Sequence, residues 1–217
     1  MSRVALVTGA SRGIGFSTSV QLAKTGVHVV ALARSTKLLE ELDDAVNAVG
    51  GTCTLMPYDL LKGDLIEGLG PLLFSKFGRL DILVGNAGML GGLQPTAQVD
   101  PSLWDQVFAL NVTANLRLIR TCDPLLRASD AGRAIFVSSR AAHKFRPFWA
   151  AYSASKAALE ALALTYAEEV SHTPLKVMAF DPGQVRTAMR AQAYPGEDPS
   201  SLASPDDVAA KIVALCA

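Results

Sequence analysis

The sequence has no hydrophobic run of the roughly 20 residues that a membrane-spanning helix needs. Its first apolar run, residues 4–7, ends at Thr8-Gly9, which is too early for the hydrophobic region of a signal peptide. Neither charge is in excess, because 20 Lys and Arg balance 20 Asp and Glu, so no overall field attracts nucleic acid or an anionic membrane. We therefore expect a soluble cytoplasmic protein with neither nucleic acid nor a membrane as a partner.

Cysteine is scarce, and the three present, Cys53, Cys122 and Cys216, have neither metal-ligand spacing nor the spacing of a redox pair. Their odd number and wide separation favour free thiols in a reducing compartment, and we expect no bound metal. Linkers, repeats and low-complexity tracts are also missing. Half of the 217 residues are hydrophobic and 18% are charged, which is typical of a well-buried globular chain. We therefore predict a single domain over residues 1–217.

What is present is a regular alternation of short apolar runs with longer helical patterns. It predicts parallel strands joined by right-handed crossovers, with helices on both faces of the sheet. The expected fold class is a Rossmann-type, doubly wound α/β fold with three layers (α/β/α) and about six strands. The predicted strands lie near Val4–Thr8, His28–Ala33, Thr54–Met56, Asp81–Gly85, Ala134–Ser138 and Lys176–Phe180. The predicted helices lie near residues 13–24, 38–49, 65–77, 102–126, 151–170 and 205–216.

A glycine-rich turn joins the first predicted strand to the first predicted helix. Gly9 allows a tight turn, Gly13 lets the backbone approach a pyrophosphate, and Gly15 permits close packing of helix against strand. The helix N-terminus offers free N–H groups and a partial positive charge to the phosphates. The spacing is G-x-x-x-G-x-G and not G-x-G-x-x-G, but the strand–turn–helix context is the one that the motif requires. The residues expected to contact a dinucleotide here are Gly9, Ser11, Arg12, Gly13, Ile14 and Gly15.

Charge near the second predicted strand indicates which dinucleotide is bound. Units that bind NAD usually place an acidic residue about 20 residues past the glycines, for the ribose 2′-hydroxyl. Here no acidic residue precedes Glu40, and the strand ends in Arg34 and Ser35 instead. Together with Arg12 they would suit a 2′-phosphate, which guanidinium groups bind through paired hydrogen bonds. We therefore expect NADP(H) as the preferred cofactor. NAD(H) remains possible, because both arginines could simply be solvated.

Tyr152 and Lys156 are four residues apart in a predicted helix, so both side chains can reach one site. A free tyrosine has a pKa of about 10, which is too high for efficient acid/base work at neutral pH. A neighbouring ammonium favours the phenolate, and we expect it to lower the tyrosine pKa by roughly two units. A tyrosine and a lysine four residues apart are common by chance. The pair therefore indicates an active site only together with the neighbouring motifs.

Those neighbours are present in a fixed order along the chain. Ser139 follows the end of a predicted strand, where parallel sheets carry their ligands, and Asn111 sits in a long helical pattern that does not favour asparagine. Together these motifs resemble the short-chain dehydrogenase/reductase family over about residues 3–190. The motifs that carry the resemblance are 8–15, Gly85-Asn86-Ala87-Gly88, Asn111, Ser139, Tyr152, Lys156 and Pro182-Gly183.

The resemblance implies a role for each matching residue. Tyr152 would exchange a proton with the substrate oxygen, and Ser139 would donate a hydrogen bond to that oxygen. Lys156 would lower the Tyr152 pKa and bind the nicotinamide ribose, and Asn111 would hold a water that links Lys156 to solvent. The other residues that the resemblance assigns to the cofactor are Asp59, Leu60, Asn86, Ala87, Gly88, Pro182, Gly183, Val185 and Thr187. Homodimers or homotetramers through residues 102–126 and 151–170 are also implied.

Two departures from the family pattern are visible. Gly85 stands where the family has asparagine, which we expect to loosen a contact at a strand end. About thirty residues follow Gly183, so we expect six strands, not seven, and a reduced lid over the substrate.

Substrate-facing candidates are largely apolar or aromatic, which favours a carbonyl compound with hydrophobic substituents. Lys144 and Arg146 could recruit an anionic substrate or be ordinary loop charges. The other candidates are Met89, Leu90, His143, Phe145, Phe148, Trp149, Met189 and Tyr194.

The resemblance implies an enzyme that transfers a hydride between NADP(H) and a small carbonyl or alcohol substrate. A dehydratase or epimerase on the same scaffold is an alternative, and so is a catalytically silent protein that senses a dinucleotide or acts as a scaffold. The silent protein is expected to have lost Ser139, Tyr152 or Lys156, and this sequence keeps all three.

Overall fold

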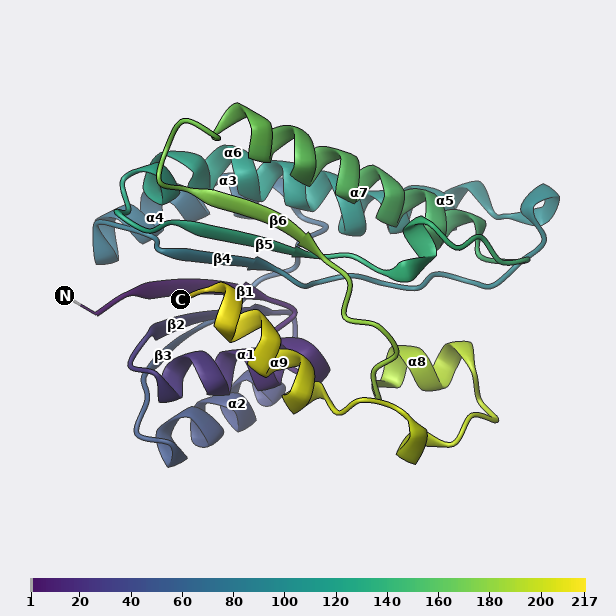
Figure 1. The fold of residues 1–217 in the computed structure, drawn as a ribbon, viewed down its shortest axis with the longest axis horizontal. Coiled ribbons are helices and arrows are strands. Elements are labelled where there is room, and N and C mark those ends of the chain that lie inside the picture. The colour runs from purple at the N-terminus through teal and green to yellow at the C-terminus, as the bar shows by residue number, and fades with distance from the viewer. Residues whose placement is uncertain (1) are drawn as a thin grey trace.

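A computed structural model describes residues 2–217. Six parallel strands form one sheet in the order β3-β2-β1-β4-β5-β6 (Figure 1). This confirms the Rossmann-type fold and the predicted number of strands, and β1, β2 and β6 have the predicted bounds. The strands are β1 (Val4–Thr8), β2 (His28–Ala33), β3 (Cys53–Pro57), β4 (Ile82–Gly85), β5 (Arg133–Val137) and β6 (Lys176–Phe180).

Helices cover both faces of the sheet, and the central strands are therefore apolar on both sides. All five residues of β1 and all four of β4 are buried. In Figure 1, α3 to α7 lie above the sheet, and α1, α2 and α9 lie below it. The helices are α1 (Gly13–Lys24), α2 (Thr36–Ala48), α3 (Gly63–Glu67), α4 (Leu69–Phe77), α5 (Pro101–Phe108), α6 (Ala114–Arg127), α7 (Ala150–Glu169), α8 (Ala188–Ala193) and α9 (Pro205–Leu215).

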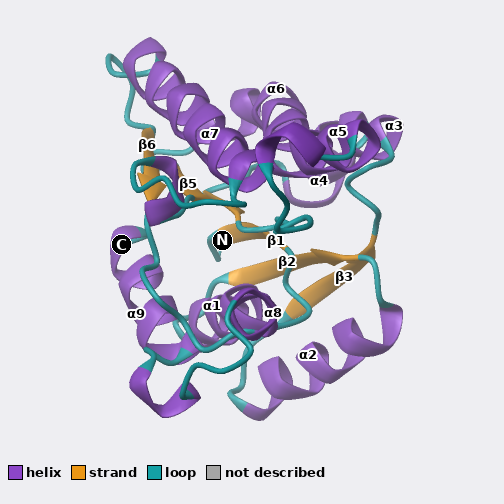
Figure 2. Ribbon diagram, turned by 90° about the vertical axis from the view of Figure 1, so that its right-hand side faces the viewer, coloured by secondary structure: helices purple, strands orange, loops and turns teal. Residues whose placement is uncertain are grey.

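The strand order reverses between β1 and β4, which are neighbours although β2 and β3 lie between them in the chain. In open α/β sheets such a reversal opens a crevice at the carboxyl ends of the strands, where ligands bind. Figure 2 looks at that end of the molecule, with α8 lying in front of the sheet. The termini lie at the opposite end in Figure 1.

Two predicted helices are interrupted. The segment predicted near residues 65–77 forms α3 and α4, which meet at Gly68. Pro71 explains the break, because a proline inside a continuous helix lacks a donor and clashes with the carbonyl four residues earlier, whereas the first turn of a new helix accepts it. The segment predicted near 102–126 begins at Pro101 and contains a π-helical turn, Ala109–Thr113, between α5 and α6.

The C-terminal part contains one helix that the sequence analysis missed, α8. Its first turn is capped by Thr187, whose Oγ1 accepts a hydrogen bond from the Arg190 amide at 3.2 Å. Ser204 caps α9: its hydroxyl accepts from the Asp207 amide at 3.1 Å, and Pro205 occupies the first turn.

A buried carboxylate ties the strands together at the end of the sheet opposite the crevice. Asp81, whose side chain is 1% exposed, accepts hydrogen bonds from the Val4 amide at 2.8 Å and from the Ser129 hydroxyl at 2.6 Å. Arg79 forms an ion pair with it. Burial would raise the pKa of Asp81, but the hydrogen bonds from Arg79, Ser129 and Val4 together lower it. The group therefore stays ionised at neutral pH.

The three cysteines carry free thiols, as predicted, with Cys122 and Cys216 buried. Burial and a hydrogen bond to Asp43 raise the pKa of Cys53 to about 12. Within residues 2–217, no helix is both long enough and apolar enough to cross a bilayer.

Candidate active site

The glycine turn has the backbone geometry that a bound pyrophosphate needs. Gly9 and Gly13 have φ of 63° and 55°, in the left-handed region that favours glycine. At Gly15 a Cβ atom would lie 2.3 Å from the Gly9 carbonyl oxygen and 2.5 Å from Asn86 Nδ2, so only glycine fits. No side chain caps the N-terminus of α1, and its first turn holds no acidic residue. The free N–H groups there match the anionic pyrophosphate of a dinucleotide.

Thr8, the first residue of the glycine-rich motif, to which the sequence analysis gave no role, joins the carboxyl ends of β1 and β4. Its Oγ1 donates to the Val84 carbonyl at 3.2 Å and accepts from the Asn86 and Ala87 amides, both at 3.0 Å. Asn86 Nδ2 in turn donates to the Thr8 carbonyl at 2.9 Å. These bonds fix the segment after β4 against the glycine turn. The signal in the sequence that could have identified Thr8 is a hydroxyl-bearing residue at the end of an otherwise apolar strand.

The space beside Gly85 is filled by side chains from neighbouring elements. A Cβ atom at Gly85 would lie 2.5 Å from Asn115 Oδ1 and 2.6 Å from Phe136 Cδ1. The departure from the family's asparagine is therefore accompanied by close packing at this strand end.

The residues predicted to select the cofactor lie around one end of the crevice. Arg12, Arg34, Ser35 and Asp59 all line the same cavity. The Ser35 hydroxyl also caps α2, because it accepts from the Leu38 amide at 3.4 Å. Its own proton remains available to a ligand.

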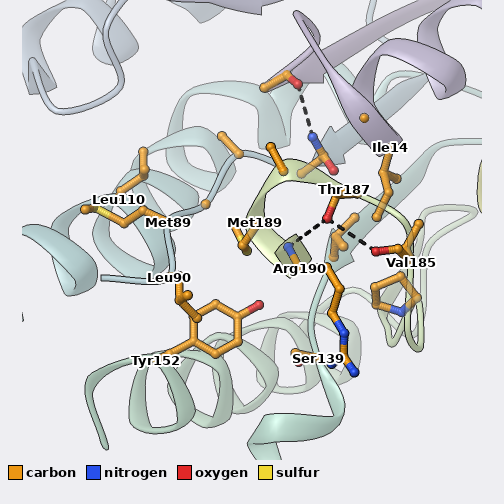
Figure 3. Close-up of a pocket in the computed structure, with 18 of the residues that line it drawn as sticks. Ile14, Met89, Leu90, Leu110, Ser139, Tyr152, Val185, Thr187, Met189 and Arg190 are labelled. Atoms are coloured by element: carbon orange, nitrogen blue, oxygen red, sulfur yellow. Dashed lines mark hydrogen bonds between the residues drawn. The ribbon is translucent and has the colours of Figure 1, made fainter. Parts of the chain in front are cut away.

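Tyr152 and Ser139 both line the cavity, and Figure 3 shows the Tyr152 hydroxyl directed into it. Tyr152 is 8% exposed and packs in a small apolar cluster with Leu90 and Ala141. Burial raises the pKa of Tyr152, while the interaction with the Ser139 side chain lowers it and the charge of Asp181 raises it further. The net shift is upward, so the phenol holds its proton at neutral pH.

Lys156 is enclosed beneath Tyr152. Its Nζ donates to the backbone carbonyl of Val137, the last residue of β5, at 2.7 Å, and lies 5.8 Å from the centre of the Tyr152 ring. Burial lowers the pKa of Lys156 to about 8, although the nearby Glu160 raises it.

The expectation that Lys156 lowers the Tyr152 pKa by about two units is wrong for this structure. The ammonium bonds to a backbone carbonyl and not to the phenol, and both side chains are largely buried. Removal from water disfavours the charged form of each group, which raises a tyrosine pKa and lowers a lysine pKa. The four-residue spacing in the sequence predicted that the two side chains lie close together, but not that both are buried to this degree.

Asn111 lies in the π-helical turn and is fully buried. Its Oδ1 accepts from the Met89 amide at 2.9 Å, and its Nδ2 donates to the Met89 carbonyl at 3.0 Å and to the Ser155 hydroxyl at 2.9 Å. Asn115 Nδ2 donates to the Asn111 carbonyl at 2.9 Å. Asn111 therefore clamps the segment after β4 to α7, and its role in holding a water stays a prediction.

Most of the predicted site residues line one cavity of about 1350 Å³. Among the predicted catalytic and cofactor residues, Gly15 and Asn111 do not line it: Gly15 packs beneath the turn, and Asn111 lies behind the cavity wall. The residues that do line it are Gly9, Ser11, Arg12, Gly13, Ile14, Arg34, Ser35, Asp59, Leu60, Asn86, Ala87, Gly88, Ser139, Tyr152, Lys156, Pro182, Gly183, Val185 and Thr187.

The substrate-facing candidates divide into two sets. Met89, Leu90, Lys144, Arg146, Trp149, Met189 and Tyr194 line the cavity. His143, Phe145 and Phe148 do not: His143 pairs with Glu160 at 2.5 Å, and the two phenylalanines are 79% and 53% exposed. Sequence order alone could not say which side of a loop faces the cavity. Sequence reasoning also missed Arg140, Gln184, Arg186 and Arg190, although each is within three residues of a predicted site residue.

Comparison with known proteins identifies the family of this chain. Residues 3–198 match the short chain dehydrogenase family. The chain belongs to the short-chain dehydrogenase family. It is 37% identical over 209 residues to the uncharacterized oxidoreductase YciK of Escherichia coli K12, an alignment covering 95% of this chain and 82% of YciK. It is 35% identical to the hydroxynaphthalene reductase-like protein Arp2 of Metarhizium brunneum, covering 86% of this chain and 70% of Arp2.

A solved structure shows the same architecture with a cofactor. The short chain dehydrogenase of Shigella flexneri 2a, in complex with NADP, superposes with a TM-score of 0.92 at 36% identity, covering 99% of this chain and 90% of that one. As a short-chain dehydrogenase, this chain is an oxidoreductase, and its solved relatives include NADP complexes.

Proposed function

We propose that this short-chain dehydrogenase reduces a ketone or aldehyde with NADPH, and oxidises the corresponding alcohol in reverse. The observation that carries the proposal is the placement of Tyr152 and Ser139 in one cavity with the glycine turn. The bound nicotinamide supplies the hydride, and the chain supplies position, polarity and a proton.

The protonation state of Tyr152 supports reduction. Because burial raises its pKa, the phenol carries a proton that it can donate to a carbonyl oxygen. The Ser139 hydroxyl, which also faces the cavity, can donate a hydrogen bond to the same oxygen as negative charge develops there. In the oxidation direction the phenol would first have to lose its proton.

NADP(H) is supported as the preferred cofactor by charge and by relatives. Arg12 and Arg34 line the end of the cavity next to Ser35, and neither has a carboxylate within 4.0 Å among residues 2–217. Two free guanidinium groups favour a ligand with an additional phosphate. The NADP complex of the Shigella flexneri relative agrees with this choice.

Reduction also agrees with one relative, the hydroxynaphthalene reductase-like protein Arp2 of Metarhizium brunneum. The cavity wall near Tyr152 is apolar, with Leu90, Trp149 and Met189 around the phenol. Such a wall suits a carbonyl compound with hydrophobic substituents.

The proposal is tested by following NADPH oxidation with a panel of ketones and aldehydes. Tyr152→Phe is expected to lower turnover by about 10²–10⁴-fold, the usual range for general acid catalysis, while NADPH affinity stays the same. Tyr166→Phe is the matched control, because Tyr166 is on the same helix but bonds to Asp123 outside the cavity. A Tyr152→Phe protein with unchanged turnover would contradict the proposal.

The alternatives give different results in the same assay. A dehydratase or epimerase would change its substrate without net loss of NADPH. A silent sensor or scaffold protein would bind NADPH and turn over none of the panel.

A further inference from the structure

The cavity is strongly cationic although the chain as a whole is neutral. Among its charged lining residues, Asp59 is the single acid in the part of the chain that the structure describes. The basic residues that line it are Arg12, Arg34, Arg140, Lys144, Arg146, Lys156, Arg186 and Arg190. Because the excess is confined to the cavity, it points to the ligands and not to the surface at large.

Some of these charges already have partners. Arg190 makes a paired ion bridge to Glu197, with N–O distances of 2.6 and 2.5 Å, and Arg140 lies 3.7 Å from Asp181. Arg12 and Arg34 belong to the cofactor end. Lys156 bonds to the Val137 carbonyl beneath Tyr152, and Arg186 acts on Asp207, whose pKa it lowers. Of the eight, Lys144 and Arg146 remain, in the segment between β5 and α7.

Lys144 and Arg146 have no carboxylate within 4.0 Å among residues 2–217. Arg146 does act on Glu197, whose pKa is lowered first by Arg190 and to a smaller extent by Arg146. The single carboxylate of Glu197 thus interacts with two guanidinium groups, those of Arg190 and Arg146, and Lys144 adds a third positive charge. The substrate end therefore holds more positive than negative charge, and an anionic ligand would balance it.

Aromatic rings connect this cationic rim to the acid. The Arg146 guanidinium contacts the Tyr194 hydroxyl, and that of Arg190 lies 3.8 Å from the centre of the Tyr194 ring. The Tyr194 ring centre is 5.7 Å from that of Trp149, which is 5.8 Å from that of Tyr152. The rings of Tyr194, Trp149 and Tyr152 therefore lie in a row between the position of an anion at Arg146 and that of a carbonyl at Tyr152.

The wall between these two positions is apolar. Trp149 lies between the two tyrosines, and Leu90, Met189 and Ala193 complete the lining. Figure 3 shows Leu90 beside the Tyr152 ring and Met189 further into the cavity. A ligand that spans this distance needs an apolar middle, because an unpaired polar group there would lose its hydrogen bonds to water.

We propose that the substrate is an oxo acid: a ketone or aldehyde joined through an apolar or aromatic spacer to a carboxylate that Lys144 and Arg146 bind. The inference rests on the proposed reductase function. In the reaction, NADPH gives a hydride to the carbonyl carbon and Tyr152 gives a proton to its oxygen, leaving NADP⁺ and a hydroxy acid. The carboxylate is unchanged and serves as the handle for binding.

The test compares oxo acids with their methyl esters, which keep the shape and lose the charge. Three acids are used, with the carbonyl and the carboxylate separated by two methylenes, four methylenes or one benzene ring. With wild-type protein and NADPH, we expect kcat/KM at least ten-fold higher for the best acid than for its ester. Added salt should lower the value for the acid and leave the ester unaffected, because screening weakens attraction between charges.

Charge-removing variants identify the residues. The double variant Lys144→Gln/Arg146→Gln should lose about 10- to 100-fold in kcat/KM for the acid, the range for charged hydrogen bonds, and less than about two-fold for the ester. The matched control is Lys24→Gln/Arg120→Gln, which removes two exposed charges outside the cavity and should change neither value.

A binding measurement separates this inference from the reductase proposal. Dissociation constants of each acid and ester are measured with the NADPH complex of Tyr152→Phe. Tighter binding of the acid, with no turnover by the wild type, would leave the anion site standing and overturn the reductase proposal. Equal binding of acid and ester, or no binding of either, would overturn the anion site even if neutral ketones are reduced.

Discussion

Lys156 donates a hydrogen bond from its side-chain nitrogen to the backbone carbonyl of Val137 at 2.7 Å, in a place with almost no access to solvent. The bond joins α7 to the end of β5, directly before Ser138 and Ser139. It also explains how a lysine remains in the interior: one strong acceptor partly replaces water, while burial still lowers its pKa to about 8.

This burial predicts how stability depends on pH. The pKa of an unfolded lysine is about 10.4, so between about pH 8 and pH 10 the unfolded chain holds a proton that the folded chain has released. The contribution of Lys156 to the free energy of unfolding should therefore rise with pH, by about 1 kcal/mol from pH 8 to pH 9. Tyr152, whose pKa is raised, stays protonated in both states over that interval.

Urea unfolding of the wild type and of Lys156→Met checks this prediction. The three thiols, whose pKa values are raised, act in the opposite direction as the unfolded thiols ionise, from about pH 8 upward, and they do so in both proteins. The difference between the two proteins therefore reports the lysine alone. A difference that does not change from pH 7 to pH 9 would mean that Lys156 titrates normally.

Arg12 and Arg34 should distinguish the two dinucleotides. Removing both charges, as in Arg12→Gln/Arg34→Gln, is expected to weaken NADPH binding at least ten-fold and NADH binding hardly at all, because only NADPH carries a 2′-phosphate. Fluorescence titration of both cofactors gives the two dissociation constants. Equal losses for NADPH and NADH would rule out the 2′-phosphate as their target.

Gly15→Ala tests the glycine turn. The added methyl would lie 2.3 Å from the Gly9 carbonyl oxygen, a backbone atom that moves only with the turn itself. We expect NADPH binding to fall below detection and stability to fall by about 1–3 kcal/mol. Gly196→Ala is the matched control, since no atom lies within 4 Å of its Cβ position. Normal cofactor affinity in Gly15→Ala would show that the turn does not bind the phosphates as proposed.

Asp81→Ala should affect stability and leave the site intact. The substitution leaves the buried Val4 amide without an acceptor and Arg79 without its ion pair. We expect the free energy of unfolding to fall by about 2–4 kcal/mol. NADPH affinity should be unchanged, because the crevice is at the other end of the strands. The lowered pKa means that this stability is present above about pH 4, near the unfolded pKa of Asp81, and disappears as the pH falls below it. Thermal unfolding beside Asp105→Ala, an exposed position, measures the loss. A loss of less than 0.5 kcal/mol, the size of an ordinary surface effect, would contradict it.

The positions and number of the strands were predictable because each strand is an apolar run bounded by turn residues. The need for glycine at position 15 was predictable for a similar reason, because it depends on the local turn between strand and helix. Asn111 was noticed only as an unusual residue in a helical pattern. The π-helical turn around it depends on bonds to Met89 and Ser155, which are distant in sequence.

The pKa of Tyr152 was not predictable, because it depends on how many atoms from other elements cover the phenol and on where the Lys156 nitrogen finds its acceptor. The orientation of residues 143–149 was missed for the same kind of reason. Trp149 turns into the cavity while Phe148 beside it turns out, and Phe148 has a φ of 75°, which is uncommon for a residue other than glycine.

The central position of β1 also bears on how the chain folds during synthesis. One neighbour, β2, is complete by residue 33, but the other, β4, ends only at residue 85. A nascent chain of intermediate length therefore has a largely apolar strand with one unpaired edge, the kind of surface that associates with other chains. The ribosome-bound intermediate should be most prone to aggregation in this interval, and β4 closes that edge.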